Sequence, residues 1–124
     1  MKKRQIFYYL IDCELRNKQF PDSFFLPEHN EIASIKPGDC VQLIFNDKER
    51  MWVQVTHRDK DNFEGTLSSF PLIIDTVQFG DIITFKTKYI CQVEDKEFTK
   101  RHIEKVKEQI RIDEAIKARR KNKT

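Results

Sequence analysis

Polar and apolar residues alternate in the middle of the chain, with the period of two that is typical of a half-buried β-strand. Between residues 49 and 57 the apolar positions are Met51, Val53 and Val55, and the intervening positions are Arg50, Trp52, Gln54 and Thr56. Residues 58–62 are polar and predict a turn, after which residues 63–67 return as a second strand. We therefore expect a hairpin whose aliphatic face points into the core.

A weak internal repeat predicts how two more strands begin. Residues 35–45 and 77–85 each place an apolar residue three positions before a Gly-Asp pair, and each ends in Phe. Glycine permits a positive φ at a turn, and aspartate can accept hydrogen bonds from nearby backbone amides. Asp39 and Asp81 are therefore expected to form turns, although their symmetrical positions could be mistaken for paired catalytic carboxylates.

Several other segments give weaker signals. Residues 6–11 are apolar and are interpreted as a buried strand or a short helix. Pro27 can occupy the first turn of a brief helix that runs to Ile32 or Ser34. The remaining predicted elements are a short element at residues 72–77 and a last strand at residues 89–93.

The pattern becomes helical after about residue 95. Asp95 and Thr99 can each cap the start of a helix, and the apolar residues that follow recur at helical spacing. They are Ile103, Val106 and Ile110. This stripe is long enough to dock about two helical turns onto the body.

Past residue 110 the apolar stripe moves, because Ile112 and Ile116 would lie nearly opposite to it on a helix. Two interpretations are open. Either the helix continues away from the body and offers a second apolar face to a partner, or it ends and the remaining residues fray. The cationic residues at this end are Lys117, Arg119, Arg120, Lys121 and Lys123.

Together these elements predict an α+β fold, with a small twisted antiparallel sheet or open barrel, a short N-terminal helix and a basic C-terminal helix. A chain of 124 residues can bury one hydrophobic core. Residues 1–95 are expected to form the sheet domain, and residues 96–124 the helix that packs on it.

Charge divides the chain at the same place. Residues 1–95 carry 12 Lys/Arg and 15 Asp/Glu, whereas residues 96–124 carry 11 and 5. The positive excess therefore belongs to the C-terminal helix. It would suit phosphate contacts with a nucleic acid or contact with an acidic protein, although no aromatic residues interleave with the cluster.

The composition excludes several classes of protein. The longest apolar run, residues 6–11, is far shorter than a membrane span, and the acidic residues that follow it argue against a secretory signal. Cys13, Cys40 and Cys91 are odd in number and widely spaced, unlike a disulfide framework or a zinc motif. We expect a cytoplasmic protein with no metal and no cofactor. No local pattern indicates a nucleophile held by a base, so no enzyme activity is predicted.

The order of five motifs resembles that of an uncharacterised bacterial domain family. The pattern is GDxVxLxF, ERMWVxV, GxL, P and GDxIxF, which corresponds here to residues 38–45, 49–55, 65–67, 71 and 80–85. The resemblance covers residues 24–93 and implies a bacterial origin and a non-enzymatic role. Some related domains are associated with polymorphic-toxin immunity loci. Family members often carry Asn two residues before the Pro, where this chain has Ser69. Serine can serve a turn there through its hydroxyl, whereas a contact between Asn and a ligand would be altered.

The face opposite the aliphatic core is the predicted binding surface. It carries Arg50, Trp52 and Gln54, and Trp and Arg are favoured at binding hot spots. The alternative is that the C-terminal helix or the segment at residues 24–25 covers this face and makes Trp52 part of a second core layer.

These observations predict a bacterial protein-binding module, of an immunity type that masks a cognate toxin, with the basic tail as an electrostatic aid. The alternative is a small nucleic-acid-binding domain that uses the basic helix. The sequence leaves open whether the chain is a monomer or a dimer.

Overall fold

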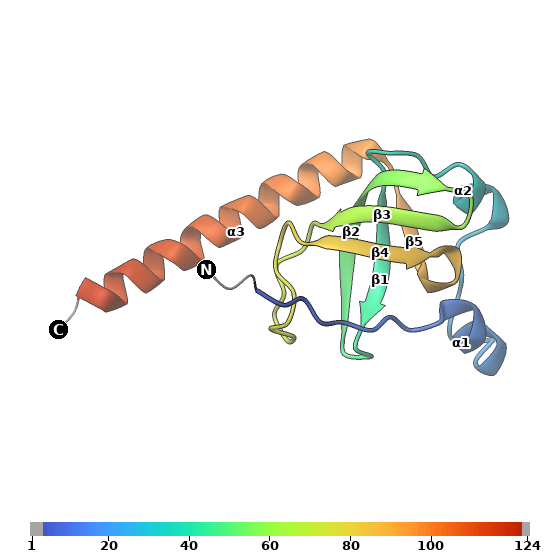
Figure 1. Ribbon diagram of the computed structural model, residues 1–124, viewed down its shortest axis with the longest axis horizontal. Coiled ribbons are helices and arrows are strands. Elements are labelled where there is room, and N and C mark those ends of the chain that lie inside the picture. The colour runs from blue at the N-terminus through green and yellow to red at the C-terminus, as the bar shows by residue number, and fades with distance from the viewer. Residues whose placement is uncertain (1–3, 123–124) are drawn as a thin grey trace.

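The predicted hairpin lies at the centre of a five-stranded antiparallel sheet with the order β4-β3-β2-β1-β5 (Figure 1). The structure is a computed structural model that describes residues 4–122. Strands β2 (Glu49–Asp59) and β3 (Asn62–Leu67) are longer than the pattern indicated, because Asp59 still pairs with Asn62. The turn is therefore shorter than the predicted one at residues 58–62. The predicted α+β class is confirmed, and the sheet is open.

The weak sequence repeat is also a structural repeat, because both Gly-Asp turns dock on the central hairpin in the same way. Before β1 (Cys40–Phe45), the Gly38 amide donates to the Val55 carbonyl and the Val55 amide donates to the Asp39 carbonyl. Before β4 (Ile82–Lys86), the corresponding bonds join Gly80, Leu67 and Asp81. Each turn thus starts an outer strand against one strand of the hairpin.

The turns themselves have the predicted chemistry. Gly38 and Gly80 adopt φ values of 99° and 91°, which a side chain would disfavour. The Asp39 carboxylate accepts from the Lys36 amide at 3.0 Å, and the Asp81 carboxylate accepts from the Gln78 amide at 2.7 Å. Both aspartates are therefore turn formers, as predicted.

One face of the sheet carries the main core, and the aliphatic residues of β2 point into it as predicted. Its largest buried side chains are Leu43, Phe45, Met51, Leu67, Ile83 and Ile90. Gly65 lets β2 and β3 approach closely, since a Cβ there would lie 2.6 Å from Val53 Cγ1 and would also collide with the Gln54 carbonyl. The glycine of the GxL motif is therefore required by packing.

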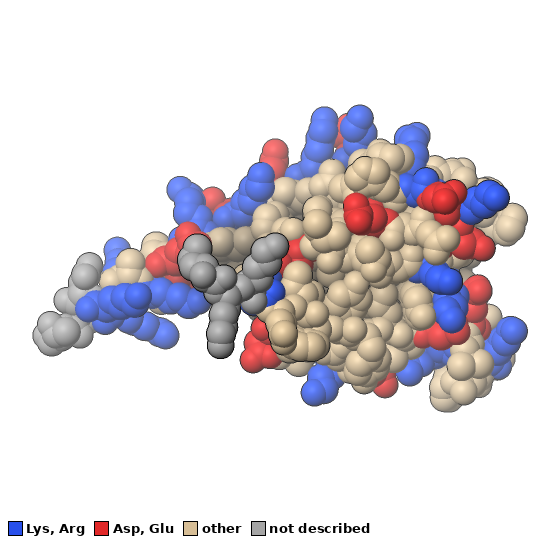
Figure 2. All heavy atoms as spheres, viewed as in Figure 1, with Lys and Arg blue, Asp and Glu red and all other residues tan. Residues whose placement is uncertain are grey.

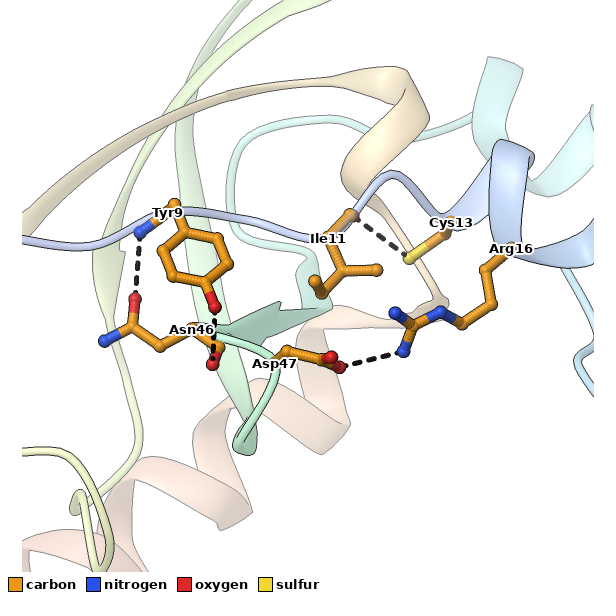
Figure 3. A network of polar contacts seen from close by, with 6 residues as sticks. All are labelled: Tyr9, Ile11, Cys13, Arg16, Asn46 and Asp47. Carbon is orange, nitrogen blue, oxygen red and sulfur yellow. Dashed lines mark hydrogen bonds and ion pairs between the residues drawn. The ribbon is translucent and has the colours of Figure 1, made fainter.

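The N-terminal segment crosses the core as an extended strap, which corrects the interpretation of residues 6–11 as a buried strand or short helix. Its only strand-like pairing within the described residues is a bridge between Leu10 and Phe45. Tyr9 and Asn46 exchange hydrogen bonds beside it, and the Arg16 guanidinium pairs with Asp47 at 2.9 Å (Figure 3). The strap is thus held at Tyr9 by the β1–β2 turn and at Tyr8 by the backbone of Thr84 on β4.

Two short helices follow the strap. Helix α1 (Cys13–Gln19) was not predicted, although Asp12 caps it by accepting from the Leu15 amide at 3.0 Å. Helix α2 (His29–Ala33) corresponds to the helix predicted with Pro27 in its first turn, but Pro27 lies before the helix and Glu28 is its N-cap.

Two weaker predictions are also corrected. Residues 72–77 contain no helix or strand, and the amides of residues 72–74 donate to the Glu49 carboxylate instead of to a sheet partner. The predicted strand at residues 89–93 is divided into a 3₁₀ turn, η1 (Thr87–Tyr89), and strand β5 (Gln92–Glu94). The turn bends the chain so that only the last residues pair with β1.

Helix α3 spans Lys96–Asn122 and is continuous. Asp95 caps it by accepting from the Phe98 amide at 2.9 Å, in agreement with one of the two predicted caps. The helix starts on the sheet and then extends well beyond it (Figure 1). Of the two interpretations of the residues after 110, the structure therefore has the continuing helix. Within residues 4–122, no helix is long and apolar enough to cross a membrane.

Candidate functional site

The second face of the sheet is partly covered by the start of α3. Trp52 lies on this face, and its ring centroid is 4.7 Å from that of Phe98 and 6.3 Å from that of His102. Trp52 is half-buried. The face opposite the aliphatic core is therefore a second packed layer here, as the alternative interpretation of Trp52 proposed.

Ser69, the position at which the chain departs from the family pattern, has a structural task. Strand β3 ends at Leu67, and the Ser68 amide that follows it still donates to the Trp52 carbonyl at 2.8 Å. The Trp52 amide donates to Ser69 Oγ at 2.8 Å, and the Gln54 amide donates to Ser68 Oγ at 3.0 Å. Both serines are buried, where an unpaired amide would be costly. Each serine hydroxyl thus serves as the acceptor for one amide of β2.

Glu49 fixes the loop that follows these serines. Its carboxylate accepts hydrogen bonds from three consecutive amides, those of Leu72, Ile73 and Ile74, at 2.8, 2.9 and 3.1 Å. Ile74 is buried, but the side chains of Leu72 and Ile73 are 82% and 64% exposed. A single carboxylate therefore holds two large aliphatic side chains out toward solvent on a fixed backbone. We call residues 69–73 the serine-leucine loop.

A groove of about 470 Å³ lies between this loop and α3. Trp52 and Arg50 line it from the sheet, and Leu72 lines it from the loop. The helix contributes His102, Lys105, Val106 and Gln109. The groove therefore combines aromatic and aliphatic surface with the cationic side chain of Lys105. Glu49 also lines it, but its carboxylate already accepts hydrogen bonds from the loop amides.

His102 connects the groove to the packed layer beneath it. Its ring stacks on Phe98 with centroids 5.7 Å apart, and its Nε2 atom lies 3.4 Å from Ser69 Oγ. Burial lowers the pKa of His102, and the nearby Lys105 charge acts in the same direction against the opposing effect of the Ser68 carbonyl. The neutral imidazole is thus favoured in the folded state.

The predicted binding residues fall in different places. Arg50 and Trp52 line the groove, whereas Gln54 does not. The cationic residues of the tail lie far along α3, where Figure 2 shows Lys and Arg side chains near its projecting end. Lys123 lies outside the described residues. Glu49 and the serine-leucine loop were missed, although Glu49 is part of the ERMWVxV motif.

Three residues of metal-ligand type, Cys40, Cys91 and His57, do not come together. Cys40 is buried under α3, Cys91 lies beside Arg50, and His57 is exposed near the end of β2. Within residues 4–122, no group of three or more His, Cys, Asp or Glu side chains is arranged to hold a metal ion.

The fold and the groove define a small α+β domain with one sheet, two covered faces and a projecting helix. The chain belongs to the family described as an uncharacterised protein conserved in bacteria (DUF2314), whose sequence profile matches residues 28–103. This confirms the resemblance to an uncharacterised bacterial domain family. Neither the curated proteins nor the solved structures provide a match. The matched residues include the sheet side of the groove and the serine-leucine loop, but end before Lys105 and the projecting half of α3.

Proposed function

We propose that this chain is a non-enzymatic, protein-binding module that receives an acidic and apolar segment of a partner in the groove between the serine-leucine loop and α3. The observation that carries the proposal is the Glu49 clamp. It holds Leu72 and Ile73 exposed on a fixed backbone. Exposed apolar side chains of this kind are typical of interaction sites, and a pre-ordered loop loses little entropy on binding.

The charge of the groove supports the choice of partner. The cationic Lys105 lines it, while the Glu49 carboxylate is engaged by three amides. Complementary charge favours encounter with an acidic surface, and the half-buried Trp52 ring offers a contact for apolar side chains. Among protein partners, a toxin that is masked by direct binding is favoured by the resemblance to domains of immunity loci.

A nucleic-acid role is supported less well. At about 100° per residue, Lys117, Arg120 and Lys121 fall on one side of α3, and only Arg119 lies opposite to them. Binding of a single strand also uses aromatic side chains beside the basic face for stacking, and residues 103–122 contain no Phe, Tyr or Trp.

The test uses the protein encoded directly upstream of this chain, purified and titrated calorimetrically against the full chain. Lys105→Glu reverses a charge that lines the groove, and we expect it to weaken binding about tenfold or more. Lys100→Glu is the matched control, because it makes the same change at an exposed position of α3 outside the groove. If the upstream protein is a toxin, co-expression of the wild-type chain should restore growth.

The opposite result has a defined form. The proposal fails if the upstream protein does not bind while mixed-sequence RNA or DNA does at physiological salt. Affinity for the nucleic acid would then fall steeply as salt rises and disappear when residues 117–124 are deleted.

A further inference from the structure

The three cysteines of the chain differ in what surrounds them. Cys40 is buried beneath α3, and burial raises its pKa to about 12 despite a hydrogen bond with Thr99. Cys13 and Cys91 instead share one packed cluster with Phe24 and Ile44, and their thiols lie within hydrogen-bonding reach of each other. Residues far apart in the sequence therefore form a pair of adjacent thiols.

Backbone contacts hold both sulfur atoms in place. The Cys13 sulfur lies 3.4 Å from the carbonyl oxygen of Tyr89, which is two residues before Cys91. The Cys91 sulfur lies 3.1 Å from the carbonyl oxygen of Gln42 on β1. One thiol thus comes from the start of α1 and the other from the residue directly before β5.

The two thiols differ in their access to solvent. Cys13 is fully buried. Cys91 is also buried, at 7% exposed, but it lines an opening of about 450 Å³ together with Phe24 and Arg50. A small reagent can therefore reach Cys91 first, and Cys13 lies behind it.

Arg50 is the charged group beside the accessible thiol. Its Nη1 atom is 3.9 Å from the Cys91 sulfur, and its guanidinium lies over the Phe24 ring at 5.5 Å from the centroid. The hydrogen bond from Cys13 lowers the pKa of Cys91, and the Arg50 charge helps against the opposing effect of burial. The hydrogen bond with Cys91 and, to a smaller extent, burial raise the pKa of Cys13. Of the two thiols, Cys91 is thus the more readily ionised, and the thiolate is the reactive form of cysteine.

We propose that Cys91 and Cys13 are a peroxide-reactive dithiol, with Cys91 as the attacking thiol and Cys13 as the resolving one. The Cys91 thiolate attacks a hydroperoxide. A sulfur–oxygen bond forms, the oxygen–oxygen bond breaks, and the released oxygen leaves as water or an alcohol after taking up a proton. The Cys13 sulfur then attacks the sulfenic sulfur of Cys91. The disulfide forms as the sulfur–oxygen bond breaks, and water leaves with the proton of Cys13. The two thiols lose two electrons and the peroxide gains them. This inference does not depend on the proposed partner.

The test treats the reduced, full-length chain with hydrogen peroxide and follows the intact mass without reductant. We expect the loss of two hydrogen atoms and a single crosslinked peptide pair, containing Cys13 and Cys91. Cys40→Ser is the matched control and should oxidise like the wild type, because Cys40 lies outside the pair.

Single substitutions separate the two roles. Cys13→Ser should leave a sulfenic acid on Cys91 that a cyclic 1,3-diketone traps, whereas Cys91→Ser should abolish both trapping and crosslinking. Arg50→Gln should slow the reaction several-fold, with circular dichroism showing that each variant is folded.

Two results would overturn the proposal. One is that the native wild-type chain stays reduced under peroxide conditions that oxidise the urea-unfolded chain. The other is that Cys40 is trapped before Cys91.

Discussion

The first half of α3 lies on the sheet, whereas the second half projects from it (Figure 1). In the first half, Thr99 and Val106 are buried and Phe98 packs on Trp52. In the second half, Ile112 and Ile116 remain 45% and 46% exposed. The same helix therefore contains a part that tertiary contacts stabilise and a part that depends on local interactions.

Local interactions that favour the projecting half are present. Lys117 pairs with Asp113 one turn earlier at 3.1 Å, and the last turn carries Arg119, Arg120 and Lys121. Cations near the C-terminus of a helix interact favourably with its dipole. Each such contribution is only a few tenths of a kcal/mol, so the projecting half can be altered with little effect on the fold. The docked half therefore both packs on the sheet and lines the groove, whereas substitutions in the projecting half leave the groove unchanged.

Trp52→Ala tests the docked half most severely. The substitution removes the ring that packs on Phe98 and His102, so we expect the free energy of unfolding to fall by about 2–4 kcal/mol. Denaturant unfolding followed by circular dichroism measures it. An unchanged midpoint would mean that α3 does not depend on the sheet for its docking.

A matched pair of aliphatic truncations compares the two halves directly. Val106→Ala should cost about 1–2 kcal/mol, because this side chain is buried against the groove. Ile112→Ala removes more carbon from an exposed position and should change stability by less than about 0.5 kcal/mol. Equal losses in the same unfolding assay would show that the projecting half is packed against something in solution.

The pH dependence of stability should show the smallest effect. The folded-state pKa of His102 is depressed, so the unfolded chain takes up the proton first as pH falls. The contribution of the neutral His102 to the free energy of unfolding is therefore fully present above the ordinary pKa of about 6.5, and it declines as pH falls below that value. His102→Gln should flatten the curve between about pH 7 and pH 5. Parallel curves of stability against pH for the wild type and His102→Gln would contradict the lowered pKa of His102.

Much of the sheet could be predicted because its signals are local. The alternation at residues 49–57 and the two Gly-Asp turns depend on neighbouring residues, and both were confirmed. The strap at residues 6–11 was wrongly predicted as buried or helical, because its partners are the distant Asn46 and Thr76. An apolar run alone does not reveal that half of its side chains will face solvent.

The candidate groove was only partly predictable for the same reason. Strand alternation placed Arg50 and Trp52 on one face, and they do line the groove. Gln54 shares that face but lies elsewhere, because the position of α3 along the sheet decides which residues stay accessible. The binding of the serine-leucine loop by Glu49 joins residues more than twenty positions apart, and no local spacing signals it.

The docking of both Gly-Asp turns on one hairpin has a consequence for the order of folding. The β2–β3 hairpin closes a short loop, and the strands on either side then add to a template that already exists. Local contacts of this kind form early, because little chain entropy is lost in closing them. The strap must wait, since its Phe7 amide donates a hydrogen bond to the carbonyl of the distant Thr76, in the loop between β3 and β4. Pulse-labelling of backbone amides during refolding should therefore protect the hairpin first and the strap last.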